Sequence, residues 1–235
     1  ENSTEAVKTL LAARADIHKA THGGLTPLYT VAYKGVSENV KALLAARAKI
    51  NKTNNDGHTP LHCSAQQGHE NVVTILLDKR APIDTQDNDK QTALIHATKT
   101  RYKNIVEILL NKGASIDATD KHGNTALYCA ANFGDTGIVK TLIKARAQVD
   151  KSAHMKENPL CVAAKNGHEN VVKMLLDARA DINKPDNNGI TLLYMAAYNG
   201  FTENVKVLLE ARADIDKTNN YGHTPLHCSA QQGHE

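Results

Sequence analysis

Aromatic side chains are scarce in this sequence. Phe, Trp and Tyr together make up 4% of the 235 residues, and Trp is absent. Aromatic rings supply much of the buried area of a large single core, so we expect that this chain does not form a large, aromatic-rich core. The hydrophobic fraction of 41% and the charged fraction of 23% are otherwise ordinary for a globular protein.

Long apolar runs, paired cysteines and an excess of one charge are also missing. The longest apolar stretches, such as residues 72–77, fall far short of the roughly 20 residues of a membrane span. The four cysteines show no CxxC spacing, which favours a reducing, intracellular and cytoplasmic setting. The net charge of +3 is too small and too evenly spread for a basic nucleic-acid-binding stripe. We therefore expect no membrane span and no nucleic-acid partner.

The sequence does contain a repeat. A tetrapeptide of the Thr-Pro-Leu type starts at residues 26, 59, 92, 125, 158, 191 and 224, each time 33 residues after the previous start. A period of this length is typical of repeat arrays and not of separate globular domains. The sequence predicts a single array over residues 1–235, with a partial repeat at 1–25, six full periods at 26–223 and a partial repeat at 224–235.

The repeat that starts at Thr59 predicts a short first helix. The hydroxyl of Thr59 can cap the helix, and Pro60 suits the first helical position because its missing N–H costs nothing there. Gly68 can end the helix by adopting the left-handed conformation.

A second helix and a loop complete each unit. Val73, Leu76 and Leu77 recur at the spacing of an amphipathic helix. Residues 81–90 are polar and rich in turn formers, which predicts an extended hairpin-like loop. Helices this short are not stable alone, so we expect them to stack on neighbouring repeats.

This pattern resembles the ankyrin repeat over essentially the whole chain. The residues that carry the resemblance are Gly57-His-Thr-Pro-Leu-His-Cys-Ser-Ala65, Gly68-His69, Val73, Leu76-Leu77 and Ala81-x-Ile-Asp84. The resemblance implies an all-α repeat solenoid of stacked helix-turn-helix units with projecting hairpin loops. It also implies a scaffold that binds protein.

Some positions depart from the family pattern. Arginine replaces the glycine that commonly ends the second helix at positions 14, 47, 80, 146, 179 and 212, and Gly113 alone keeps it. A left-handed arginine costs roughly 1 kcal/mol. Lys90 and Lys156 replace the hairpin glycine, and Arg101 replaces an inter-helix glycine. We expect local distortion in the hairpins of these two lysines.

No group of residues indicates catalysis. The His-Glu pairs at 69–70 and 168–169 lack the second histidine of a metalloprotease helix. Cys63 and His62 are helix neighbours that point in different directions, so we expect a packed cysteine and a hydrogen-bonding histidine. We expect no enzyme activity, no cofactor and no metal.

We expect a protein partner to bind the concave face, where the hairpin tips and first helices lie. The residue pairs before each inter-helix glycine position differ between repeats, and they include three lysines, three aromatic residues and no acid. Exposed aromatics commonly anchor interfaces, and the lysines favour a neutral to acidic partner surface. The expected partner-binding residues in this row are Tyr33, Lys34, Gln66, Gln67, Lys99, Asn132, Phe133, Lys165, Asn166, Tyr198 and Asn199. At or near the hairpin tips they are Asn55, Asp56, His58, Asn88, Asp89, Lys121, His122, His154, Met155, Asn187, Asn188 and Tyr221.

Other interpretations stay open. The chain is alternatively a passive structural spacer or scaffold segment of a larger protein, or a segment that regulates an enzyme within its own chain. Both ends cut the repeat out of phase, which predicts a fragment of a longer array. Leu10, Leu11 and Leu226 lack their usual partners, so we expect frayed ends or weak head-to-tail self-association.

Overall fold

The structure is a computed structural model that describes residues 2–151, 153 and 157–233. The described residues form fourteen α-helices joined by turns and loops. They fall into two compact units, Glu1–Lys121 and His122–Glu235. Each unit repeats the same pair of helices, as the ankyrin-like pattern predicts.

Helices of two kinds alternate along the chain. A first helix starts at the Thr-Pro-Leu tetrapeptide, and a second helix follows a short inter-helix turn. The first unit contains α1 (Asn2–Ala12), α2 (Pro27–Lys34), α3 (Ser37–Ala45), α4 (Pro60–Gln66), α5 (Glu70–Asp78), α6 (Ala93–Lys99) and α7 (Lys103–Asn111). The second contains α8 (Ala126–Asn132), α9 (Thr136–Lys144), α10 (Pro159–Lys165), α11 (Glu169–Asp177), α12 (Leu192–Tyr198), α13 (Thr202–Glu210) and α14 (Pro225–Gln232).

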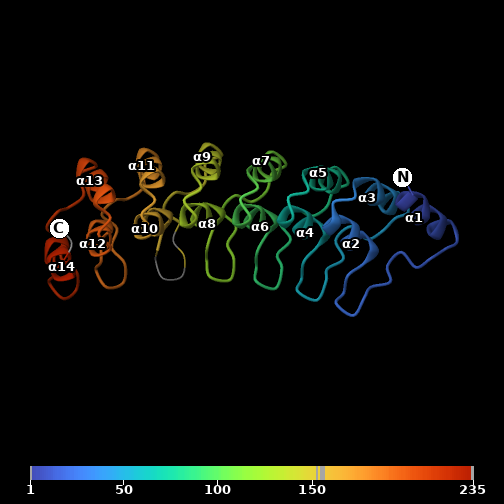
Figure 1. Ribbon diagram of the computed structural model, residues 1–235, viewed down its shortest axis with the longest axis horizontal. Coiled ribbons are helices and arrows are strands. Elements are labelled where there is room, and N and C mark those ends of the chain that lie inside the picture. Colours follow the sequence, from blue (N-terminus) through green and yellow to red (C-terminus); the bar gives the residue numbers. More distant parts are fainter. Residues whose placement is uncertain (1, 152, 154–156, 234–235) are drawn as a thin grey trace. The chain divides into compact units, whose positions relative to one another are not determined.

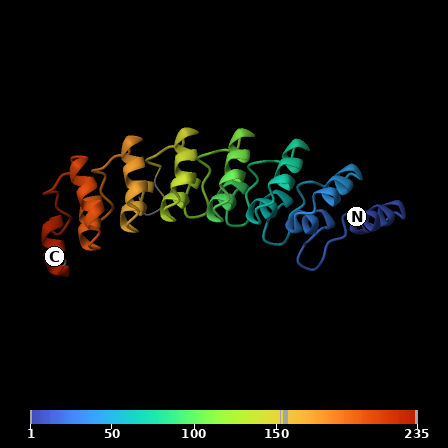
Figure 2. The same cartoon turned by 45° about the horizontal axis from the view of Figure 1, so that its top comes forward.

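Within each unit, helices of the same kind pack side by side. In the first unit α4 contacts α2 and α6, while α5 contacts α3 and α7. In the second unit α10 contacts α8 and α12, and α11 contacts α9 and α13. The loops between repeats project from the side of the first helices (Figure 1). Figure 2 shows the helix pairs of each unit stacked one beside the next.

Side-chain caps begin the first helices α2, α4, α6, α8, α10, α12 and α14. The hydroxyl of Thr59 accepts a hydrogen bond from the backbone N–H of His62 at 3.3 Å, which confirms the predicted cap. Asn158 departs from the threonine of the pattern and performs the same task, since its Oδ1 accepts from the N–H of Cys161 at 2.8 Å. The change of residue therefore leaves the start of α10 intact.

The arginines that follow the second helices adopt the left-handed conformation. Their φ angles lie between 60° and 66°, so each replaces glycine at a cost of roughly 1 kcal/mol. Lys90 does the same in its hairpin, with a φ of 58°. That hairpin keeps the bond from the N–H of Asp87 to the carbonyl of Gln91 at 3.0 Å, like its neighbours. The expected distortion at Lys90 is thus wrong, because lysine tolerates the conformation; Lys156 lies outside the described residues.

Stacking on both flanks buries first helices such as α4 on nearly all sides. Every residue of α4 from Pro60 to Ala65 is buried, because helices lie on both flanks and α5 lies behind. The second helices bury one stripe. In α5 that stripe is Val72, Val73 and Leu76, whereas Leu77 is only half-buried.

Asn204 is a buried polar residue at a position where Val171 stands one repeat earlier. Its Nδ2 donates to the carbonyl of Ala164 at 3.1 Å, but its Oδ1 has no hydrogen-bond partner. We expect Asn204→Val to raise the free energy of unfolding by about 1 kcal/mol, because a buried unpaired carbonyl oxygen costs about that much. Urea denaturation measures the change, and Val171→Asn is the reverse control. A less stable Asn204→Val protein would show that the bond to Ala164 outweighs the unpaired oxygen.

Candidate partner-binding face

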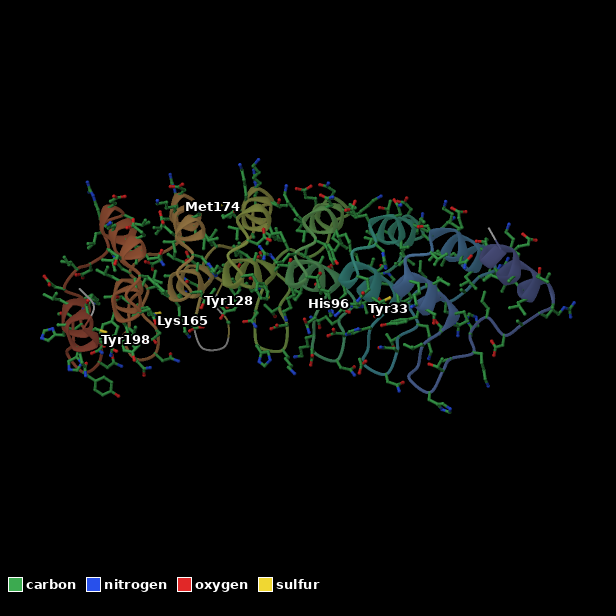
Figure 3. The ribbon with its side chains drawn as sticks, in the orientation of Figure 1. Tyr33, His96, Tyr128, Lys165, Met174 and Tyr198 are labelled. Carbon is green, nitrogen blue, oxygen red and sulfur yellow. The ribbon has the colours of Figure 1, made fainter. Side chains whose placement is uncertain are left out.

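The hairpin tips and the C-terminal ends of the first helices form one face of each unit, which we call the hairpin face. In the first unit Tyr33 lies on this side of the helices (Figure 3). In the second unit Lys165 and Tyr198 lie on this side, and Met174 lies among the second helices (Figure 3). The hairpin face thus carries the row of residues that varies between repeats.

Aromatic side chains stand exposed on this face. Tyr33 is 44% exposed, Phe133 43% and Tyr198 49%. Tyr221, at a hairpin tip, is 79% exposed. These rings are available to a partner, in a chain that has few aromatic residues.

A shallow pocket lies beside Tyr198 in the second unit. Its lining is Lys165, Ile190, Tyr194, Met195, Tyr198 and Asn199. Two phenol rings, a thioether and an aliphatic side chain can receive an apolar group of a partner, and the lysine adds a charge at the edge. Ile190, Tyr194 and Met195 were not among the predicted site residues. The sequence signal that could have revealed them is their closeness to the variable position 198, since Tyr194 and Met195 lie on α12 and Ile190 lies in the hairpin before it.

Acidic groups neutralise two of the three lysines on the face. Lys99 Nζ lies 3.2 Å from Asp120 Oδ2, and Lys165 Nζ lies 3.2 Å from Glu157 Oε1. These acids belong to hairpins, so the row of variable residues alone does not reveal them. The face therefore carries less positive charge than the three lysines suggest.

The remaining residues of the variable row differ in their contacts. Lys34, Asn166 and Asn199 are exposed, whereas Gln66, Gln67 and Asn132 are half-buried. Asn166 Nδ2 donates to Asn132 Oδ1 at 3.1 Å. Asn199 Nδ2 donates to the carbonyl of Met195 at 2.9 Å. Asn199 thereby orders the end of its own helix, whereas Asn166 joins the end of its helix to that of the preceding repeat; both side chains still reach solvent.

The hairpin tips are linked to one another through asparagine side chains. Asn55 Nδ2 donates to the carbonyl of His22, and Asn88 Nδ2 donates to the carbonyl of Asn55, both at 3.0 Å. Asp89 pairs with Lys121 at 2.8 Å. These contacts link the hairpin tips of the first unit to one another.

Most of the predicted tip residues remain accessible. The exposed ones are Asn55, Asp56, Asn88, Asp89, Lys121, His122, Asn187, Asn188 and Tyr221. His154 and Met155 lie outside the described residues. The tips thus present mainly polar groups, which suits a hydrated contact.

A family model described as ankyrin repeats in three copies matches residues 1–87, 79–153, 116–186 and 160–235. The chain belongs to the ankyrin-repeat family. Ankyrin repeats are generally protein–protein interaction modules and are typically not enzymes. A search of the curated proteins finds no match to the chain. Among the described residues, no helix is both long and apolar enough to span a membrane.

Two histidines at the inter-helix turns join successive ankyrin repeats. His69 Nε2 donates to the carbonyl of Tyr33 at 2.9 Å, and His168 Nε2 donates to the carbonyl of Asn132 at 3.0 Å. Each histidine thereby satisfies a carbonyl that the end of the preceding first helix leaves unpaired.

Three further histidines gather around Asp87 between the repeats that start at Thr59 and Thr92. The Nε2 atoms of His58 and His96 lie 3.2 and 2.8 Å from Asp87 Oδ2. The ring of His62 lies 5.5 Å from that of His96. Sequence reasoning placed His58 among the partner-binding residues, whereas the structure places it half-buried against this carboxylate. It did not single out Asp87 or His96.

Burial and hydrogen bonds shift the pKa values of His62, His96 and Asp87. Burial lowers the pKa of His62 to about 4, so the ring is neutral near pH 7. Burial also lowers the pKa of His96, against the opposing effect of Asp87. Burial would raise the pKa of Asp87, but hydrogen bonds from His96 and the backbone outweigh it and hold that pKa below the ordinary value.

Cys63 is not a nucleophile of the kind that a neighbouring histidine would activate. Burial raises the pKa of its thiol to about 12. Its Sγ lies 3.2 Å from the carbonyl oxygen of Pro60, which belongs to the same helical turn. His62 directs Nδ1 to Thr59 and Nε2 to the carbonyl of Gln91, away from the sulfur. Both residues therefore act in packing and hydrogen bonding, as predicted.

Proposed function

We propose that this ankyrin-repeat chain binds a protein partner on its hairpin face and performs no catalysis. One observation carries the proposal: three aromatic residues, Tyr33, Phe133 and Tyr198, are exposed at the C-terminal ends of first helices in three different repeats. The packing of a repeat does not require these rings, because Lys99, Lys165 and glutamine occupy the same row elsewhere.

The pocket beside Tyr198 supports the same function. It places apolar surface near the polar hairpin tips of the same unit. There Asn220 Nδ2 donates to the carbonyl of Asn187 at 3.2 Å, and tips fixed in this way lower the entropy lost when a partner binds. Polar tips around aromatic anchors are the usual composition of a hydrated protein interface. The organisation of residues 1–235 as one array, and its place in the cytoplasm, remain predictions.

We expect Tyr198→Ala to weaken binding of the partner by at least about tenfold, because an aromatic hot spot contributes roughly 2 kcal/mol or more. Cross-linking mass spectrometry in the source cell identifies the partner, and calorimetry with the purified pair gives the dissociation constant. Tyr33→Ala and the double variant test whether the first unit takes part.

Met174→Ala is the matched control, because Met174 lies on α11 in the same unit and away from the hairpin face. Equal loss from Tyr198→Ala and Met174→Ala would contradict a hairpin-face site. If cross-linking finds no partner and none is retained by the whole chain, the spacer interpretation is favoured instead.

A further inference from the structure

Two imidazole nitrogens and a carboxylate oxygen converge on one point in the first unit. His58 comes from the hairpin before α4, Asp87 from the next hairpin and His96 from α6. The three candidate ligand atoms lie within 4.8 Å of one another. Ligands about 2.1 Å from a tetrahedral zinc ion lie about 3.4 Å apart. Two of the three separations, 2.8 and 3.2 Å, are already close to that value.

The carboxylate is held in place for this task. Asp87 Oδ1 accepts hydrogen bonds from the backbone N–H groups of Asp89 and Gln91 at 2.9 and 2.8 Å. Oδ2 is thereby directed at the two rings. Such outer hydrogen bonds orient a metal ligand and are a regular part of metal sites.

We propose that His58, Asp87 and His96 form a binding site for a divalent transition-metal ion, with zinc as the expected ion. Two imidazole nitrogens and one carboxylate oxygen are a donor set that suits zinc and is poor for calcium or magnesium, which require more oxygen ligands. Three protein ligands leave one position open. The side chain of His58 is 21% exposed, so solvent or a further ligand reaches that position.

The ankyrin repeat itself does not require this cluster. The positions equivalent to His58 hold Leu25, Gln91, Asn124, Glu157, Ile190 and His223. The positions equivalent to His96 hold Thr30, Cys63, Cys129, Val162, Met195 and Cys228. In the described part of the chain, this is the one place where two histidines and a carboxylate bring candidate ligand atoms this close together. A bound ion would replace the two hydrogen bonds to Oδ2 and join two successive repeats by coordination.

Titration calorimetry of the intact chain with zinc chloride tests the proposal. We expect one ion per chain, and binding that is at least about tenfold weaker in each of His58→Gln, Asp87→Asn and His96→Val, since even outer-shell changes cost that much. Each new residue occupies the equivalent position of another repeat, namely Gln91, Asn54 and Val162, so the fold should tolerate it. Cobalt(II) then gives an absorption band that reports inner-shell nitrogen ligands.

His223→Gln is the matched control, because it makes the same change as His58→Gln at an exposed equivalent position. It should leave zinc affinity unchanged. Absence of saturable binding to the intact chain, or equal affinity in the wild type and the three ligand variants, would overturn the proposal. If Asp87→Asn or His96→Val fails to fold, His58→Gln, which changes a partly exposed side chain, decides alone.

Discussion

Alanine in place of Leu76 is expected to lower the free energy of unfolding by about 2 to 5 kcal/mol. Leu76 is fully buried at the centre of α5, and α5 packs against α3, α4 and α7. Removal of its side chain loses buried apolar area and leaves a cavity that short helices can close only in part. Leu175→Ala on α11 should have the same effect, because Leu175 is the equivalent residue and is also fully buried.

Leu77→Ala is the control for Leu76→Ala. The two leucines are adjacent on α5, but Leu77 is only half-buried, so its loss should cost clearly less. Chemical denaturation measures the free energies, and native-state hydrogen exchange shows which repeats lose protection, since a repeat array opens in parts. Equal losses at the two positions would mean that stacking does not determine stability here.

The fold was predictable because its signals are local. The cap at Thr59, the left-handed position of Arg80 and the left-handed Gly68 that follows α4 depend on residues a few positions apart. A period of 33 residues then multiplies each local signal. The buried stripe of α5 was predicted less well, because periodicity alone cannot separate Val72 from Leu77, whereas stacking on both neighbours can.

The site was predictable only in outline. Exposure of Tyr33, Phe133 and Tyr198 follows from their places at the C-terminal ends of first helices, and the structure confirms that exposure. The pairing of Lys99 with Asp120 does not follow, because it depends on which hairpin lies beside which helix end. The histidine cluster has the same origin, since its members come from two repeats and only stacking brings them together.

The ring of His168 covers Gly134 in the turn between α8 and α9. Gly134 has a φ of 66°, and a Cβ added there would lie 2.5 Å from His168 Nδ1. The same ring donates to the carbonyl of Asn132 at 3.0 Å, so it cannot move without loss of that bond. Arg101 occupies the position equivalent to Gly134. The position equivalent to His168 then holds Asp135, which has no ring to clash with the arginine.

Gly134→Ala is therefore expected to lower the free energy of unfolding by about 2 to 3 kcal/mol, from the left-handed conformation and the displaced hydrogen bond together. Gly113→Ala is the control, because Gly113 also has a positive φ but no atom lies within 4 Å of an added Cβ. It should cost only about 1 kcal/mol. His168→Ala in the Gly134→Ala background should remove the clash, so the double-mutant cycle should show a coupling of about 1 kcal/mol or more. If the two glycine variants lose equal stability and the cycle shows no coupling, the contact between ring and glycine does not explain the residue at 134.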